Sequence, residues 1–318
     1  SYTVSYFQQL KLNLIRSYQI VIGDFTYLAT QITSDIIQAL IIGSLFYQIT
    51  DSTTGAFSRG GVLFFAVLYY SLAGMALTSN SFAKRPILLK QRGYSFCHPS
   101  TEFFSSFIVD QAFKLIGITG FCIIVFFLSG LKRAPGNFFV FYLFTILTSA
   151  TMNSLFQFVA LMSPNISVAN PFAGLIILSA VQYSSYMIQL PSMQPWFKWI
   201  SYINPVRYGF ESMLVDEFHN VNMPCTVSLV PQGPYYNDLP ITYKTCAFSG
   251  SQPGENYVSG NNYLRVAYQY YFSHLWKNFG ILVGFLIFFL SIAGIASEFI
   301  RTDKVGYDVL IFKKTKET

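Results

Sequence analysis

Charged side chains are scarce in this sequence. Asp, Glu, Lys and Arg make up 11% of the 318 residues, while 53% are hydrophobic; soluble domains carry roughly 25% charged residues. A chain so poor in charge cannot cover a water-facing surface, which excludes an ordinary soluble domain and predicts that lipid covers much of the protein. The 33 Phe and 22 Tyr agree with this interpretation, because aromatic rings suit helix packing and the membrane interface.

Motifs for catalysis and for metal binding are also missing. The phosphate-binding pattern Gly-x-x-x-x-Gly-Lys-Ser/Thr does not occur, so we expect no loop for ATP phosphates in this chain. The three His are scattered, no Cys/His spacing indicates a metal site, and no Ser–His–acid arrangement is found. We therefore predict no catalytic site and no metal site. The net charge of +6 comes without a compact basic patch, which argues against nucleic acid and favours cytoplasmic loops that face anionic lipid.

Long apolar runs are what the sequence does have. A bilayer core about 30 Å thick needs roughly 20 apolar residues of helix. Five segments meet this requirement and a sixth is more polar, so the prediction is an all-α membrane protein with six transmembrane helices: 27–47 (the polar one), 61–79, 103–129, 138–162, 168–190 and 279–297. Residues 2–22 alternate apolar and polar side chains at helical spacing, which predicts an amphipathic helix on the membrane surface. The alternative is a helix packed on a soluble domain.

The distribution of Lys and Arg predicts the orientation. With six spans the two termini share a side, and that side holds the basic loop after the second span and the basic C-terminal tail. Cytoplasmic loops carry an excess of Lys and Arg, so both termini are predicted to be cytoplasmic. Lys132 and Arg133, in a short external turn, argue against this orientation.

The long segment 191–273 is then external. It contains Cys225 and Cys246, and on the oxidising face of a membrane these two residues are predicted to form a disulfide; two free thiols are the alternative. The start of the segment, PSMQPWFKWISYINPVRYGFESML, is too aromatic for a solvated loop and too interrupted by Pro for a span. We interpret it as short re-entrant helices, a backbone that membranes tolerate only where protein or a water-filled cavity covers it.

Ionisable residues within the spans are few. Asp110 and Lys114 are one helical turn apart in the third span, so they share a helix face and can neutralise each other as an ion pair. Charges inside membranes are often functional, but a structural pair is the alternative. A proton relay would need acidic residues deep in several spans, and only Asp35 comes close, which weakens a proton-coupled carrier.

The cytoplasmic loop FAKRPILLKQRGYSFCHPS combines basic and apolar residues. Its charges are Lys84, Arg85, Lys90 and Arg92, and its apolar run is Ile-Leu-Leu. A plain loop does not need an apolar run. The pattern is typical of a short helix that lies parallel to the membrane and docks into a groove of a partner, and a helix resting on lipid headgroups is the alternative.

Three ordered motifs carry a resemblance that covers nearly the whole chain. They are RPILLKQRGYSFCHPSTE followed by Asp110, then NPVRYGFESMLVDEFH, and then the external loop whose two cysteines precede PGENYVSGNNYLRVAYQYYFSHLWKNFGI. Together they resemble the membrane domain of G-type ABC transporters, specifically the fungal pleiotropic drug resistance transporters. The form of the basic loop and the tail GYDVLIFKK resemble the first of the two membrane domains in such a transporter. Lys277-Asn278 and Gln111-Ala112 depart from the family's pattern and leave the substrate open.

The resemblance implies a fold and a set of partners. The fold is a six-span domain of the ABC-2 type: residues 1–25 form a connecting helix, 26–299 the transmembrane domain with its external loop 191–273, and 300–318 a cytoplasmic tail. ATP and Mg would be bound by nucleotide-binding domains outside this chain, and a second membrane domain would be related to this one by pseudo-two-fold symmetry. The chain itself would hold no cofactor, and the implied location is the plasma membrane.

The resemblance also implies roles for individual residues. Lys84, Arg85, Lys90 and Arg92 would belong to a coupling loop that carries motion from the ATP-driven domains. The second and fifth spans would line a central cavity for a lipophilic substrate, a drug or other xenobiotic or a sterol or other lipid, and the cavity residues would be Tyr69, Leu72, Met75, Phe172, Ile176, Ser179, Gln182 and Tyr183. The alternative for each is plain helix packing. For the whole chain, the alternatives to an ATP-driven transporter are a membrane anchor or scaffold subunit and an ion-coupled carrier.

Overall fold

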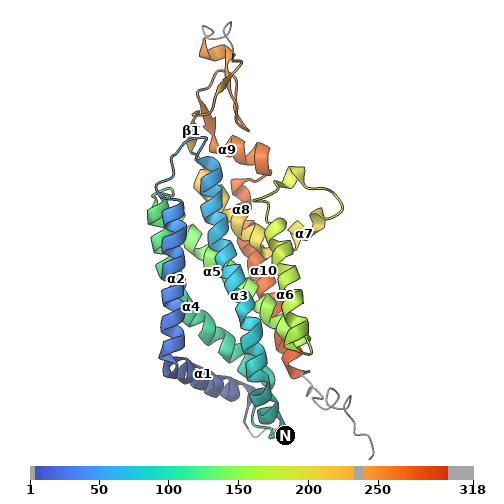
Figure 1. The fold of residues 1–318 in the computed structure, drawn as a ribbon. Coiled ribbons are helices and arrows are strands. Elements are labelled where there is room, and N and C mark those ends of the chain that lie inside the picture. Colours follow the sequence, from blue (N-terminus) through green and yellow to red (C-terminus); the bar gives the residue numbers. More distant parts are fainter. Residues whose placement is uncertain (1–3, 233–239, 300–318) are drawn as a thin grey trace, which may run out of the picture.

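The computed structural model describes residues 4–232 and 240–299. Most of this part of the chain is built from long helices, shown in Figure 1. They are α1 (Tyr6–Gly23), α2 (Phe25–Leu45), α3 (Ala56–Gly93), α4 (Pro99–Ser129), α5 (Pro135–Met162), α6 (Ile166–Gln182) and α10 (Leu275–Glu298). Between α6 and α10 lie short elements: η1 (Leu190–Ser192), α7 (Lys198–Tyr202), α8 (Pro205–Phe218), β1 (Asn222–Pro224), β2 (Leu229–Val230), η2 (Ile241–Tyr243), β3 (Thr245–Cys246), β4 (Tyr257–Ser259), α9 (Gly260–Tyr263), η3 (Leu264–Tyr268) and η4 (Phe272–His274).

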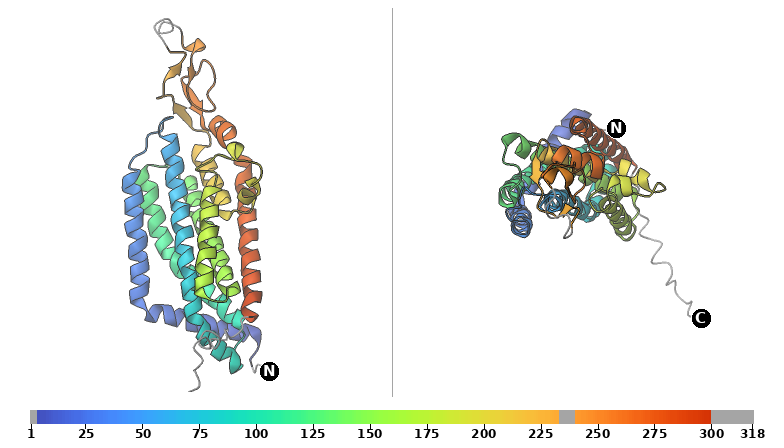
Figure 2. Two further views of the ribbon diagram at one scale, coloured as in Figure 1. Left: turned by 45° about the vertical axis from the view of Figure 1, so that its right-hand side comes forward. Right: turned by 90° about the horizontal axis from the view of Figure 1, so that it is seen from above.

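The long helices form one upright bundle. Within the described residues, five helices have the length and apolar composition to cross a membrane, namely α2, α3, α4, α5 and the helix that ends with α10. The apolar α6 stands beside them (Figure 2); its 17 residues make it about 26 Å long, slightly less than a bilayer core of about 30 Å. The predicted all-α membrane bundle is confirmed, and each of the six predicted segments overlaps one of these helices.

The sequence places several helix ends correctly for a local reason. Pro99, Pro135 and Pro205 each occupy the first turn of a helix, where a missing N–H costs nothing and the fixed φ suits the helix. Gly130, directly after α4, has φ 72°, a left-handed conformation that glycine adopts without steric cost.

The end of α6 differs from the prediction of a span over 168–190. The helix stops at Gln182, and Ser185 takes up a left-handed conformation with φ 70°. Asn204 explains this early end, because its Nδ2 donates to the carbonyl of Ala180 at 2.7 Å while its Oδ1 accepts from the amide of Val206 at 3.1 Å. One side chain therefore caps the last turn of α6 and the first turn of α8.

The predicted amphipathic helix exists as α1, but its buried face is polar. Figure 2 shows α1 lying across the lower ends of the bundle helices. Gln9, Asn13 and Ser17, spaced at i, i+4 and i+8, are its buried residues. Asn13 donates to Thr101 Oγ1 at 3.0 Å, and Gln9 Oε1 accepts from the amide of His98 at 2.9 Å. The polar stripe thus holds the start of α4, and the apolar side chains of α1 point outward, where lipid would cover them.

The segment predicted to be a cytoplasmic coupling loop is helical but is not the separate helix that the sequence predicts. α3 runs without interruption for 38 residues, through Pro86 to Gly93. The charged and apolar residues of the segment therefore extend the second span itself. Pro86 removes one backbone hydrogen bond, yet the helix continues past it because the neighbouring Arg85 is bound to the end of α5, as described below.

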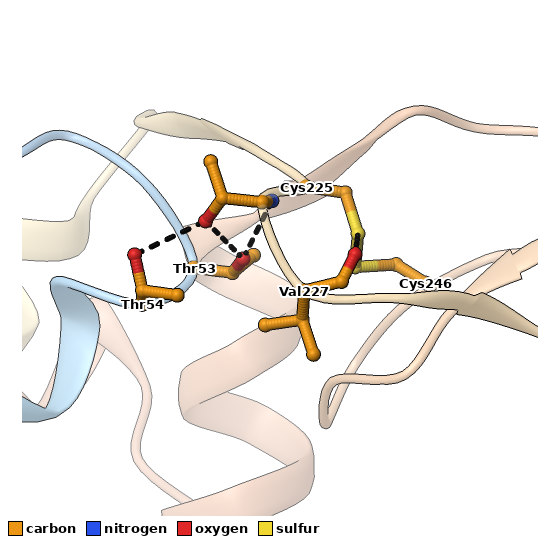
Figure 3. The surroundings of a disulfide bond; sticks show 6 residues. Thr53, Thr54, Cys225, Val227 and Cys246 are labelled. Atoms are coloured by element: carbon orange, nitrogen blue, oxygen red, sulfur yellow. Dashed lines mark hydrogen bonds between the residues drawn. A yellow bond between two sulfur atoms is a disulfide. The ribbon is translucent and has the colours of Figure 1, made fainter.

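The short strands and α9, which belong to the segment predicted to be external, sit on the end of the bundle opposite α1 (Figure 1). Strand β1 pairs with β4 and β2 pairs with β3, both antiparallel. Cys225, directly after β1, and Cys246 of β3 form the predicted disulfide. Beside it, the amide of Thr226 donates to Thr53 Oγ1 at 3.1 Å, which ties the loop before α3 to the external region (Figure 3). The other two cysteines, Cys97 and Cys122, are free and buried.

Candidate functional site

Apart from Tyr69, the side chains predicted to line a central cavity lie on α3 and on α6 or directly after it, and none of them is buried; we call them the α3/α6 surface. These two helices pack against each other, and on their outer side Leu72 is 48% exposed and Phe172 is 57% exposed. Gln182 is exposed, whereas the remaining members of this α3/α6 surface are half-buried: Met75, Ile176, Ser179 and Tyr183. The surface is apolar with a few hydroxyl and amide groups, a composition that suits lipophilic ligands.

Tyr69, also predicted to line the central cavity, differs from these residues in what it contacts. Its hydroxyl donates to Asp35 Oδ1 of α2 at 2.7 Å, and its ring stacks on Phe121 of α4 at a centroid distance of 5.4 Å. Tyr69 therefore faces α2 and α4. The sequence could not show this, because the direction of the side chain is decided by the buried acceptor on α2.

Asp35 itself fits against the backbone of α4. Gly117 provides the room: a Cβ at this position would lie 2.0 Å from Asp35 Oδ2. A buried carboxylate is costly unless it is hydrogen-bonded, and the Tyr69 hydroxyl supplies that bond. This contact joins α2, α3 and α4 in the middle of the bundle.

The four basic residues of the coupling segment do not share one environment. Arg85 is buried, and its guanidinium donates to the carbonyls of Ala160 and Ser163 at 2.6 Å each and of Pro164 at 2.9 Å. These carbonyls belong to the end of α5, where no amide of the next turn is available. Arg85 is therefore a cap that fastens α3 to α5. Lys84, Lys90 and Arg92 are exposed.

Asp110 and Lys114 lie in the same place but do not form the predicted ion pair. Both side chains line a partly open cavity of about 440 Å³ between α1, α2, α3 and α4, to which α5 and α10 also contribute residues. Among the described residues, neither has an oppositely charged atom within 4.0 Å. The two residues therefore share a helix face, as predicted, and line the same cavity.

Sequence reasoning missed a buried ionic cluster at the end of the bundle that is predicted to be external. Arg59 of α3 is bound by Glu217 of α8 and by Asp51. Glu217 also accepts from the amide of Lys132 at 3.0 Å, and Lys132 Nζ donates to the carbonyl of His219 at 2.9 Å. Burial raises the pKa of the Glu217 carboxyl, and the Arg59 charge and the Lys132 amide oppose that rise. The external Lys132, which argued against the orientation, thus has a local structural partner.

A second missed cluster joins α8 to the start of the last span. Glu211 is buried, and its Oε1 lies 3.2 Å from His274 Nδ1. Its Oε2 lies 3.6 Å from the guanidinium of Arg207. The signal was present in the motif NPVRYGFESMLVDEFH, whose Arg and two Glu are too costly to bury without partners. Within the described residues, no group of three or more His, Cys, Asp or Glu is placed to hold a metal ion.

Comparison with known proteins agrees with this architecture. The family model "ABC-2 type transporter" matches residues 8–218, and the model "CDR ABC transporter" matches residues 230–318. Protein SNQ2 of Saccharomyces cerevisiae is 51% identical over 313 residues, and ABC multidrug transporter SNQ2 of Candida glabrata is 49% identical over 313; each alignment covers 98% of this chain and 21% of the relative. ATP-dependent permease AUS1 of S. cerevisiae is 40% identical over 294 residues, 92% of this chain and 21% of the relative. The chain therefore spans about a fifth of the length of these relatives, and it belongs to the family of ABC-2 type transporters.

Proposed function

We propose that this chain is the membrane-spanning translocation domain of an ATP-driven transporter that moves lipophilic compounds across the plasma membrane. ATP and Mg would bind to nucleotide-binding domains outside this chain, and both ends of the chain would face the cytoplasm. The names of the relatives include multidrug transporters and ATP-dependent permeases, which supports this function. Drugs and other xenobiotics, sterols and other lipids all remain within the proposed substrate class.

The observation that carries the proposal is the α3/α6 surface. Leu72 and Phe172 are uncovered, and such a surface needs either lipid or another protein beside it. Ser179 and Gln182 place polar groups on the same surface, where they would be poorly satisfied in pure lipid. A second membrane domain, related by a pseudo-two-fold axis, would cover the surface and enclose a central substrate cavity.

The cytoplasmic end provides the proposed connection to ATP hydrolysis. Residues 1–25 would act as the connecting helix and 26–299 as the transmembrane domain. The exposed side chains of Lys84, Lys90 and Arg92 at the end of α3 are available to contact a nucleotide-binding domain. Because α3 is continuous from its external end to this segment, movement of the segment would be transmitted directly to the α3/α6 surface.

The energy source separates this function from an ion-coupled carrier. Sealed vesicles from cells that express the full-length transporter are given a fluorescent lipophilic substrate, with ATP, with a non-hydrolysable ATP analogue, or with an imposed proton gradient. We expect that accumulation requires hydrolysable ATP and persists when the proton gradient is collapsed. Accumulation that follows the gradient and ignores ATP would exclude the proposed function.

An anchor or scaffold subunit is the other alternative. It would leave vesicles without accumulation under every condition, although the protein is folded and inserted. Correct insertion is checked in the same vesicles, because an impermeant thiol reagent labels Cys225 and Cys246 from the external side only after reduction of the disulfide.

A further inference from the structure

The cavity between α1, α2, α3 and α4 is not part of the proposed substrate path, which runs along the α3/α6 surface. α2 packs mainly on α4 and only sparsely on α3. The cavity is partly open, and its lining comes mostly from α1, α2, α3 and α4, with Gln157 and Leu161 of α5 and Ser297 of α10. Its volume of about 440 Å³ falls within the roughly 300–1,000 Å³ of typical ligand sites. The wall is mainly apolar, with Ile20, Val21, Leu28, Leu77, Leu88 and Phe113 among its residues.

The cavity lining includes seven charged residues, the basic Arg16, Lys84, Arg85 and Lys114 and the acidic Asp24, Glu102 and Asp110. Arg85 is bound to the carbonyls at the end of α5, and Arg16 lies 3.9 Å from Glu102. Lys84 and Lys114 both act electrostatically on the carboxylate of Asp110. The four basic residues exceed the three acidic ones by one positive charge, and Asp35, which also acts on Lys114, is held by Tyr69 outside the lining.

Lys114 is an unusual residue for a helix bundle. Its side chain is nine-tenths buried, it lines the cavity, and among the described residues it has no hydrogen bond and no carboxylate oxygen within 4.0 Å. Gln157, 8% exposed, also lines the cavity, and its Oε1 has no partner. The Lys114 ammonium, which has no protein partner among the described residues, suits an anionic ligand atom in this cavity. The Gln157 oxygen is an acceptor and suits a donor such as a headgroup amine.

The position of the cavity favours a lipid as that ligand. α1 follows the first half of α4, with Asn13 bound to Thr101 and Tyr18 stacked on Phe113 at 5.8 Å. The polar end of the cavity is therefore at the level of the surface helix, where headgroups lie. Given the proposed cytoplasmic placement of α1, this is the leaflet that is rich in anionic lipids, and basic pockets between membrane helices on that side bind their headgroups.

We propose that the cavity binds one anionic phospholipid of the cytoplasmic leaflet. Its phosphate would be held by Lys84 and Lys114, and one acyl chain would lie against the apolar wall. The site touches both α1 and the cytoplasmic half of α3, the two elements proposed to receive motion from the nucleotide-binding domains. An occupied cavity keeps these elements apart, so the lipid acts as a regulator of coupling and not as transported cargo.

The test is native mass spectrometry of the purified full-length transporter, titrated with phosphatidylserine, phosphatidylcholine or oleate in the absence of nucleotide. Lys84→Gln removes one cation at an exposed position and is not expected to disturb folding. Lys11→Gln is its matched control, because Lys11 is an exposed lysine of α1 outside the cavity lining. Ser106→Trp fills the cavity from α4 without removing a charge, and Ser44→Trp is the control at an exposed helical position.

The expected result is a saturable phosphatidylserine adduct. Lys84→Gln should weaken it about ten-fold, in line with the loss of one charge-assisted contact, Ser106→Trp should abolish it, and both controls should bind as the unmodified protein does. Equal binding of phosphatidylcholine, a preference for oleate, or phosphatidylserine binding that survives both cavity variants would overturn the proposal. This measurement uses neither nucleotide nor transport. Lipid binding can therefore be absent while ATP-driven transport is present, and lipid binding can be present while ATP-driven transport is absent.

Discussion

Buried polar residues in this bundle act as connectors between helices. Asn204 caps α6 and α8 together, Arg85 fastens α3 to the end of α5, and Asp35 joins α2 to α3 through Tyr69. In a membrane, apolar packing alone distinguishes poorly between helix arrangements, because lipid tails are as apolar as the helices themselves. Polar contacts of this kind therefore specify which helices meet.

Gly117 should be intolerant of a methyl group. Gly117→Ala would place Cβ 2.0 Å from Asp35 Oδ2 and push the carboxylate away from Tyr69. We expect a loss of about 1–3 kcal/mol in the free energy of unfolding from overpacking, which exceeds the gain of about 1 kcal/mol in helix propensity. The measurement is the thermal unfolding midpoint of the purified full-length transporter.

Gly120→Ala is the matched control for this substitution. It lies one turn along the same helix, and the atom nearest to the position that its Cβ would take, in Ile36, is 4.0 Å away, so the midpoint should stay or rise. The second substitution Asp35→Ala should restore most of the stability that Gly117→Ala removes. A midpoint unchanged in Gly117→Ala, or no recovery in the double variant, would contradict the described contact.

Glu217 should be required for the external ionic cluster. Glu217→Gln leaves the buried guanidinium of Arg59 with Asp51 as its remaining acidic partner, and breaking a buried pair costs about 3 kcal/mol. We expect a lower unfolding midpoint than for Glu255→Gln, a control in the external loop. In a double-mutant cycle, Arg59→Gln should add little to Glu217→Gln, whereas additive losses would show that the two residues do not interact.

At the scale of elements, α3 is the longest helix among the described residues and serves three regions. Its external end carries Arg59, its middle contributes Leu72 to the α3/α6 surface, and its cytoplasmic end carries the basic segment. Because the helix is continuous, the two ends can move as one body. The different environments of its basic residues lead to opposite predictions for two of them.

Arg85→Gln and Lys90→Gln should separate stability from coupling. The first removes hydrogen bonds to the end of α5 and should lower the unfolding midpoint. The second changes an exposed side chain and should keep the midpoint, while it lowers the amount of substrate transported per ATP hydrolysed. Both quantities are measured on the same reconstituted full-length transporter. If Arg85→Gln were fully stable and uncoupled, Arg85 would belong to the coupling surface after all.

The sequence predicts the helices of this fold better than their ends and directions. Uninterrupted apolar runs reveal the spans because lipid demands them. The early end of α6 depends on Asn204, which lies in a later segment, and the continuation of α3 through Pro86 depends on carbonyls of α5. The direction of Tyr69 depends on Asp35. Each of these features is decided by a partner that is distant in the sequence, so local pattern could not reveal it.

At the scale of the molecule, polar contacts fasten several of the helices to one another. Polar contacts join α1 to α4, α3 to α5, and α8 to the last span, so these elements form one framework. The start of α1 and the end of α10 both contact Ser100 at the start of α4. Glu298 accepts from the amide of Ser100 at 3.0 Å, and Tyr6 donates to the Ser100 hydroxyl at 3.3 Å. The α3/α6 surface, which has no such cover among the described residues, is where we place the substrate path.

The most direct test of this account places a bulky side chain on that surface. Leu72→Trp changes an uncovered position of α3, and Ile287→Trp is the control at an uncovered position of α10, 60% exposed. Vesicles with matched amounts of each full-length variant are assayed for ATP-dependent accumulation of several lipophilic substrates. We predict that Leu72→Trp lowers transport about ten-fold or changes substrate preference, while Ile287→Trp transports normally. Normal transport by Leu72→Trp together with loss in Ile287→Trp would contradict the account.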